Sequence, residues 1–135
     1  MTGDPNRQIF AASPVLLVAD VVKAHAYFAE KLGMRSPMMW GDPPRFCIPR
    51  RDGVSVMLNQ VDAGAPIHPN ARYEGRADAY FWVRDVDVLF AEFTANGADI
   101  VCEPEDQIYK MRELSVRDVD GHLLIFGHDT SGASE

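Results

Sequence analysis

One pattern occurs twice in this sequence: a strand-like run, an Asp, a helix-like run and a Gly. The first copy runs from Ser13 to Gly33 and the second from Ala77 to Gly97. In each copy, alternating apolar residues precede the Asp and apolar residues then recur every three or four positions, which predicts a strand, a capped helix start and an amphipathic helix. Matched positions at one constant separation are Leu16 and Phe81, Val18 and Val83, Asp20 and Asp85, Val21 and Val86, and Phe28 and Phe93. Two copies of one structural module are therefore expected.

Each copy continues into two strand-like runs joined by Asp-Gly, a pair typical of a hairpin turn. The clearer hairpin spans residues 111–127 around Asp120-Gly121, and a fainter one spans residues 45–58 around Asp52-Gly53. Splitting these hairpins into their strands gives both halves the order βαβββ. The sequence thus predicts an α+β fold made of two paired βαβββ modules.

The segments between these elements are expected to be irregular. Residues 34–44 contain three prolines, and residues 61–76 combine Gly and Pro as a connector does. Residues 1–10 and the polar tail after Gly127 are expected to lie loosely on the surface. The chain is thus expected to form one domain, residues 1–135, with module one at about residues 11–60, the connector at 61–76 and module two at about residues 77–127.

Composition limits the classes of partner. Thirteen Lys and Arg against 20 Asp and Glu give a net charge of −7, which disfavours nucleic acid and anionic membranes as partners. No apolar run approaches the roughly 20 residues that span a bilayer, and the N-terminus does not resemble a secretory signal. Cys47 and Cys102 lack CxxC spacing and read as reduced thiols of a cytoplasmic protein, with a bridge between them left open.

The C-terminal run REL-x-V-R-D-x-D-G-H-L-L-x-F, together with a strand ending V-x-D and a helix closing on a Gly-Met step, carries a resemblance. Across roughly Ala12 to Gly127 the chain resembles the vicinal oxygen chelate superfamily, which holds glyoxalase I, extradiol dioxygenases, fosfomycin-resistance enzymes and bleomycin-resistance proteins. The resemblance implies that the paired modules form an open, curled mixed sheet around a cleft. It does not by itself identify a reaction.

Metal-dependent members of that superfamily carry a ligand at one matching position on each of four strands. Here these positions are Ser13, Met57, Asp78 and Ile125. One carboxylate beside thioether and alkyl groups does not make a site for a hard divalent cation. No metal and no other cofactor are therefore expected.

Within the superfamily, the chain resembles the metal-free branch, the bleomycin-resistance proteins. The opening SPVLLVADVVKAHAYFAEKLGM is similar to theirs, Pro14 included, and Tyr80 and Trp82 match two aromatics of their drug-binding region. Those proteins sequester the drug in a cleft shared by two subunits, which implies an antibiotic-resistance type of function and a homodimer here. The chain departs from them at Tyr109-Lys110-Met111, which replaces an aromatic-Gly step.

Strand alternation assigns faces independently of the resemblance. If Leu16, Val18, Phe81 and Val83 pack under the helices, the residues between them must line the opposite, inner face. Tyr80 and Trp82 are there either a stacking platform or plain filling of the barrel. Asp78 is either a counter-charge for a ligand or the partner of an inward Arg. The candidate ligand-binding residues are Trp40, Phe46, Met57, Asp78, Tyr80, Trp82, Tyr109, Glu113 and Ile125, and none is assigned as catalytic.

The positions of the histidines give little support to an acid-base or metal-binding role. His25 is expected at the flank of a buried helix stripe, His122 at a solvent-facing strand end and His68 in the connector, which leaves His128 as the histidine kept as a site candidate.

The sequence therefore predicts metal-independent binding of a small aromatic or amphipathic molecule, with a cation as the natural fit to inward carboxylates. The alternative is a lyase or dioxygenase-type enzyme of the same superfamily, for which Asp78, Glu113 and His128 are the available acid-base groups.

Overall fold

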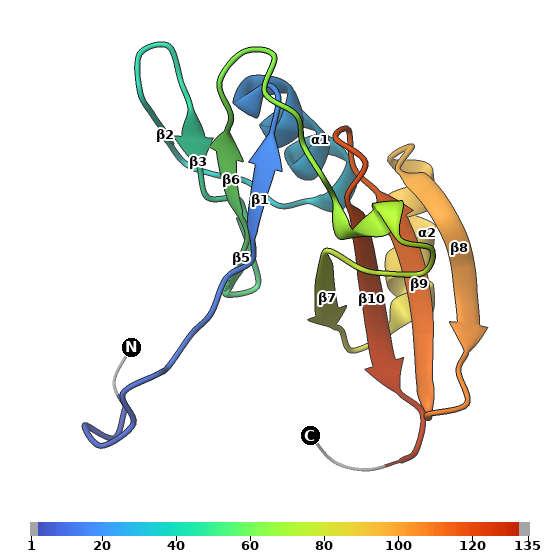
Figure 1. Cartoon of the computed structure of the whole chain (residues 1–135). Helices are drawn as coiled ribbons and strands as arrows, with labels where there is room; N and C mark the ends of the chain where they lie inside the picture. The colour runs from blue at the N-terminus through green and yellow to red at the C-terminus, as the bar shows by residue number, and fades with distance from the viewer. Residues whose placement is uncertain (1–2, 133–135) are drawn as a thin grey trace.

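The computed structural model describes residues 3–132 and shows two modules, each a strand and a helix followed by further strands (Figure 1). Module one contains β1 (Val15–Val18), α1 (Val21–Leu32), β2 (Met39–Trp40), β3 (Phe46–Cys47), β4 (Arg50–Arg51), β5 (Val54–Ser55) and β6 (Met57–Gln60). The connector contains the short 3-10 helix η1 (Asn70–Arg72). Module two contains β7 (Ala79–Trp82), α2 (Val86–Ala95), β8 (Asp99–Asp106), β9 (Met111–Arg117) and β10 (Leu123–Asp129).

Each module forms one open four-stranded sheet. The strand orders are β1-β6-β3-β2 and β7-β10-β9-β8, with β4 and β5 as a separate two-stranded hairpin in module one. In both sheets the first strand pairs in parallel with the last, whereas the other pairs are antiparallel. The predicted α+β fold with two βαβββ modules and open mixed sheets is confirmed.

The two helices that the repeat predicts begin alike, because the same two kinds of acceptor bind the N–H groups of the first turn in each. The carboxylates of Asp20 and Asp85 each accept two backbone N–H groups from the first turn of the following helix. The last strand supplies a second acceptor: Gln60 Oε1 accepts from the N–H of Val21 at 2.9 Å, and His128 Nδ1 accepts from the N–H of Val86 at 2.8 Å. The repeat therefore extends to how each helix is joined to its sheet.

Several strand predictions need correction. In module two, the first strand after α2 is β8, which lies outside the hairpin of residues 111–127, and β10 continues past Gly127 to Asp129. The first hairpin is interrupted between β3 and β4, where Pro49 offers no N–H to a ladder. The irregular run of residues 34–44 contains β2, and the connector contains η1. The end of the predicted polar tail, residues 133–135, lies outside the described residues.

One hydrophobic core joins both modules on the helix side of the sheets. Phe28 of α1 and Phe93 of α2 are both almost completely inaccessible and belong to the same cluster. Phe126 lies between Phe93, at 5.1 Å between ring centroids, and Phe81, at 4.8 Å. The hydroxyl of Tyr27 also crosses between modules, donating to the Arg117 carbonyl at 2.7 Å. The two modules therefore share packing that neither completes alone.

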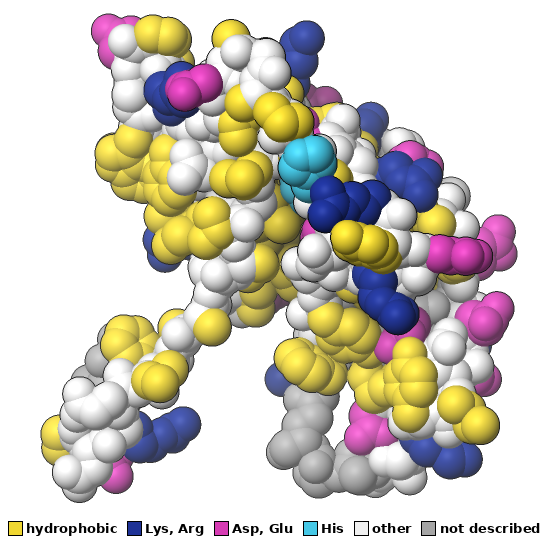
Figure 2. Space-filling view, in the orientation of Figure 1, with side chains coloured by type: hydrophobic (Ala, Val, Ile, Leu, Met, Phe, Trp, Pro, Cys, Tyr) yellow, Lys and Arg dark blue, Asp and Glu magenta, His cyan; other side chains and the backbone are white. Residues whose placement is uncertain are grey.

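The opposite faces of the sheets are open. Val15 and Leu17 are 54% and 45% exposed, whereas Leu16 and Val18, which alternate with them, are buried, as alternation predicts. Figure 2 shows hydrophobic side chains gathered over the strands of module one and, separately, over the lower part of module two. Among residues 3–132 no helix is long and apolar enough to cross a bilayer.

Candidate ligand-binding face

The aromatic part of the predicted site lies on the open face of module two. Tyr80 on β7 stands beside Ile125 on β10, which in turn stands beside Ser115 on β9. Two positions further along β7, Trp82 is 76% exposed and its ring lies 5.2 Å from that of Tyr80, measured between centroids. A large, flat and solvent-exposed indole beside a phenol offers a surface on which a planar molecule can stack.

Glu113 on β9 lies beneath these aromatics as a buried carboxylate. Only 8% of the residue is exposed. Its Oε2 accepts from the Tyr80 hydroxyl at 2.7 Å, and its Oε1 accepts from the Tyr109 hydroxyl at 2.6 Å. Both carboxylate oxygens are thus occupied by phenol donors. Across the strands its neighbours are Glu105 on β8 and Gly127 on β10.

The charge of Glu113 has no basic partner in the part of the chain that the structure describes. The adjacent Arg112 pairs instead with Asp87 and Asp106. The two phenols are held in the protonated, donating form: burial and then the bond to Glu113 raise the pKa of Tyr80, and the bond to Glu113 followed by burial raises the pKa of Tyr109 to about 12. A negative charge buried among neutral donors attracts a cation more strongly than an exposed one does.

Gly127 makes room for this arrangement. A Cβ at this position would collide with the Tyr80 hydroxyl and would lie 3.1 Å from Cγ of Glu113. The missing side chain therefore forms a notch in β10 through which the Tyr80 hydroxyl reaches Glu113. Gly127 was absent from the predicted site, although a glycine inside a strand is a known signal of close approach by another group.

The module-one part of the predicted site is apolar. Trp40 on β2 and Phe46 on β3 pair in the sheet, with 5.6 Å between their ring centroids. Met57 on β6 pairs with Val15. The structure thus divides the nine predicted residues between the two modules, three in module one and six in module two. Of the six, it links four in a series of contacts: the ring of Trp82 contacts Tyr80, and Tyr80 and Tyr109 both bond to Glu113. No hydrogen bond or ring contact within residues 3–132 links these four to the three of module one.

Asp78 has a different role from either prediction. Its Oδ1 accepts from the N–H of Asn70 at 2.6 Å, and its Oδ2 accepts from the N–H of Leu123 at 2.9 Å and of Ala71 at 3.4 Å. The expected alternative, an inward Arg as partner, is wrong, because Asp78 ties the connector to the start of β10. With both Asp78 oxygens occupied and Ser13 donating to the Ser55 carbonyl, the four positions that bind metal in the superfamily do not fit a metal ion.

Three histidines are held by hydrogen bonds that support the fold. His25 Nε2 accepts from the N–H of Ser36 at 2.9 Å, and burial followed by the charge of Arg35 lowers its pKa. His128 caps α2, as described above. The prediction of a solvent-facing His122 is wrong: the residue is 3% exposed and its Nδ1 lies 2.7 Å from Asp118 Oδ2. The sequence prediction missed this pair because it considered only that His122 directly follows the Asp-Gly turn. It did not consider that Asp118, at the other end of the turn, could bond to the imidazole.

The acid-base groups of the enzyme alternative are not gathered at one point. Asp78 bonds to the backbone of Leu123, and His128 lies at the far end of the same strand. At about 3.3 Å per residue, roughly 16 Å of β10 separates them. Cys47 is no nucleophile either, because burial raises its pKa to about 11.

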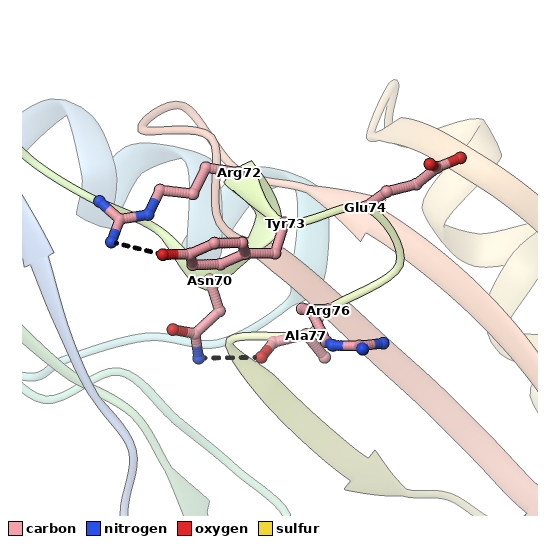
Figure 3. A pocket seen from close by; sticks show the side chains of 6 residues that line it. All are labelled: Asn70, Arg72, Tyr73, Glu74, Arg76 and Ala77. Atoms are coloured by element: carbon pink, nitrogen blue, oxygen red, sulfur yellow. Dashed lines mark hydrogen bonds between the residues drawn. The ribbon is translucent and has the colours of Figure 1, made fainter.

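Two cavities lie away from the predicted face. One, of about 640 Å³, is an open hollow of the connector, where Arg72 and Arg76 point in different directions and Arg72 donates to Tyr73 (Figure 3). The other, of about 580 Å³, lies between the modules and reaches the predicted face only at Trp82. Neither cavity is lined by Tyr80, Tyr109 or Glu113.

Comparison with known proteins agrees with this fold. The TioX structure from Micromonospora sp. ML1 is 27% identical, with a TM-score of 0.67 over 88% of this chain and 99% of that one. A glyoxalase-related enzyme from Clostridium phytofermentans is 20% identical, with a TM-score of 0.70 over 91% and 98% of the two chains. A glyoxalase/bleomycin resistance protein/dioxygenase from Nocardioides is 15% identical, with a TM-score of 0.65 over 96% and 91%. The last two likenesses concern the fold alone, and no curated protein matches the sequence.

A sequence profile assigns the family directly. The profile of the Glyoxalase/Bleomycin resistance protein/Dioxygenase superfamily matches residues 11–126, which include both modules and the connector. The chain belongs to the glyoxalase/bleomycin resistance protein/dioxygenase superfamily.

Proposed function

We propose that this protein binds a small planar aromatic cation without a metal and releases it unchanged, as the bleomycin-resistance-like members of its superfamily do. The observation that carries the proposal is Glu113, a buried carboxylate without a basic partner among the described residues, which is linked through Tyr80 to the exposed ring of Trp82. A planar cation stacks on the indole while its charge is attracted to Glu113. The net charge of −7 adds a general preference for cations.

The first test compares three acridines of nearly equal shape: 9-aminoacridine as the cation, acridine as the neutral compound and acridine-9-carboxylate as the anion. In the Trp40→Phe variant Trp82 is the single tryptophan, since the chain has two. At about pH 8, where carboxyl groups are ionised, we expect saturable quenching of Trp82 by 9-aminoacridine, weaker quenching by acridine and none by the carboxylate.

Removal of the stacking surface is the second arm of this test. Base–aromatic stacking is worth roughly 1–3 kcal/mol, so Trp82→Ala should weaken binding of 9-aminoacridine at least about fivefold, measured by the anisotropy of the dye. The bound dye should be recovered intact by mass spectrometry. A chemically altered dye would favour the enzyme alternative, and equal binding of the anion would exclude Glu113 as the attracting charge.

We further propose that two copies of the chain share the site. The open face of module one carries Val15, Leu17 and Trp40, all more than 40% exposed, and none of them is covered within the chain. A second copy placed against this face would bring the apolar group of module one to the Tyr80–Glu113 group of the partner. The homodimer is thus the assembly that completes both halves of the predicted site.

Light scattering at micromolar concentration should give about twice the chain mass of 15.0 kDa. Leu17→Asp should shift the protein to the monomer, because it places a charge in the apolar contact. Val22→Asp is the control, since Val22 is similarly exposed, at 52%, but lies on α1. A wild-type mass of one chain, or equal effects of both substitutions, would contradict the dimer.

A further inference from the structure

The two tyrosines that bind Glu113 differ in how firmly they are held. Tyr80 is partly buried on β7 and its hydroxyl occupies the notch left by Gly127. Tyr109 is 59% exposed and lies in the turn between β8 and β9, next to Ile108, which is 96% exposed. The turn itself is closed by the backbone, with the N–H of Lys110 donating to the Gln107 carbonyl at 3.1 Å. The Tyr109 side chain can therefore leave Glu113 without a change in the backbone.

Tyr109 covers the Glu113 oxygen that Tyr80 does not use. Each oxygen accepts one phenol, Oε2 from Tyr80 and Oε1 from Tyr109. Glu113 is 8% exposed with Tyr109 in place, and departure of Tyr109 would remove the donor that Oε1 has. A buried carboxylate oxygen without a donor is costly, and a charged N–H group is a stronger donor than a neutral phenol.

We propose that Tyr109 acts as a gate. In the free protein its hydroxyl occupies the position on Glu113 Oε1 that the N–H group of the ligand takes, and ligand binding displaces it. This rests on the proposed function and narrows its ligand class to planar cations that carry an N–H donor, such as protonated amines and amidines. A quaternary cation lacks that donor. It stacks on Trp82 but leaves Tyr109 on Glu113.

The test measures 9-aminoacridine and 10-methylacridinium, which are both planar monocations, while only the first has N–H donors. Tyr109→Phe removes the competing hydroxyl and keeps the ring. It should tighten 9-aminoacridine binding about tenfold, a change equivalent to about 1.4 kcal/mol, and leave 10-methylacridinium unchanged. Tyr73→Phe is the matched control, because Tyr73 is also 59% exposed but lies in the connector, and it should change neither affinity.

Resonance Raman spectra give a second measurement, which does not depend on whether a substitution changes the stability of the fold. The tyrosine doublet of the wild type should lose the signature of a strong phenol donor when 9-aminoacridine binds, and this change should be absent in Tyr109→Phe and with 10-methylacridinium. If the wild type binds 9-aminoacridine but Tyr109→Phe binds it equally or more weakly, the gate is wrong while the proposed function stands. If the wild type binds neither dye, the proposed function fails and the gate with it.

Discussion

Replacing Asp118 with Asn is expected to lower the free energy of unfolding by about 3 kcal/mol. The Asp118 side chain is completely inaccessible, and that of His122 is 4% exposed. Oδ1 of Asp118 accepts from the N–H groups of Asp120 and His122, and Oδ2 bonds to the His122 ring. The Asn side chain keeps one acceptor for the turn but removes the negative charge and presents an amide to the imidazole. Urea unfolding followed by circular dichroism measures the loss.

The effect of Asp118→Asn should depend on pH. Burial alone lowers the pKa of His122, but the hydrogen bond and charge of Asp118, with further contributions from Asp78 and Asp120, outweigh burial and raise it above the ordinary value of 6.5. A group whose pKa is raised by folding stabilises fully below its unfolded pKa, and this contribution is lost as pH rises through the folded value. The difference between wild type and variant should therefore be larger near pH 6 than in alkaline solution.

Asp62→Asn is the control for this experiment. Asp62 also pairs with a basic group, Arg45, but its side chain is 93% exposed. Exposed pairs contribute about 0–1 kcal/mol, so little change is expected. A loss for Asp118→Asn no larger than that of the control, or one that grows with pH, would contradict the charged pair.

The second large effect is expected from Phe93→Ala, which should lower the free energy of unfolding by roughly 3–5 kcal/mol. Phe93 is 1% exposed, and its ring contacts Phe126 edge-on in the core that both modules share. Truncation leaves a cavity at the junction between the modules. Because the core is shared, unfolding should remain one transition at a lower urea concentration.

Phe10→Ala removes the same ring from a residue that is 71% exposed. It should change stability by no more than about 0.5 kcal/mol. Two separate unfolding transitions for Phe93→Ala would show that the modules are stable independently, against the shared core. A loss equal to that of Phe10→Ala would show that the cavity collapses at no cost.

The repeat predicted the elements whose signals are local. Asp20 and Asp85 cap the two helices as expected, because a cap needs only a side chain and the next turn of backbone. Alternation likewise placed Leu16, Val18 and Phe81 on the buried face. β8 was not predicted, since its residues are mostly exposed and do not alternate cleanly. Its position depends on pairing with β9, which is a property of the sheet.

For the candidate site, strand alternation predicted the face of the sheet on which each side chain lies but not its hydrogen-bond partners. Tyr80, Trp82 and Glu113 were predicted to point inward, and the structure places them together on module two. The sequence did not show that Glu113 would accept two phenols, that Gly127 would admit one of them, or that Asp78 would be used by the backbone of the connector. The contacts of Tyr80 with Glu113 and Gly127 join residues far apart in the chain, and no local pattern encodes them.

The sequence by itself determined the duplicated module, its helix caps, the faces of its strands and the lack of a metal-binding donor set at Ser13, Met57, Asp78 and Ile125. Each of these follows from residue type and local periodicity. The tertiary structure alone decided that His122 is buried with Asp118, that the predicted site is divided between the two modules, and that Glu113 is buried without a basic partner among the described residues. These depend on which strands become neighbours, because burial and charge pairing arise from packing across the sheet and not along the chain.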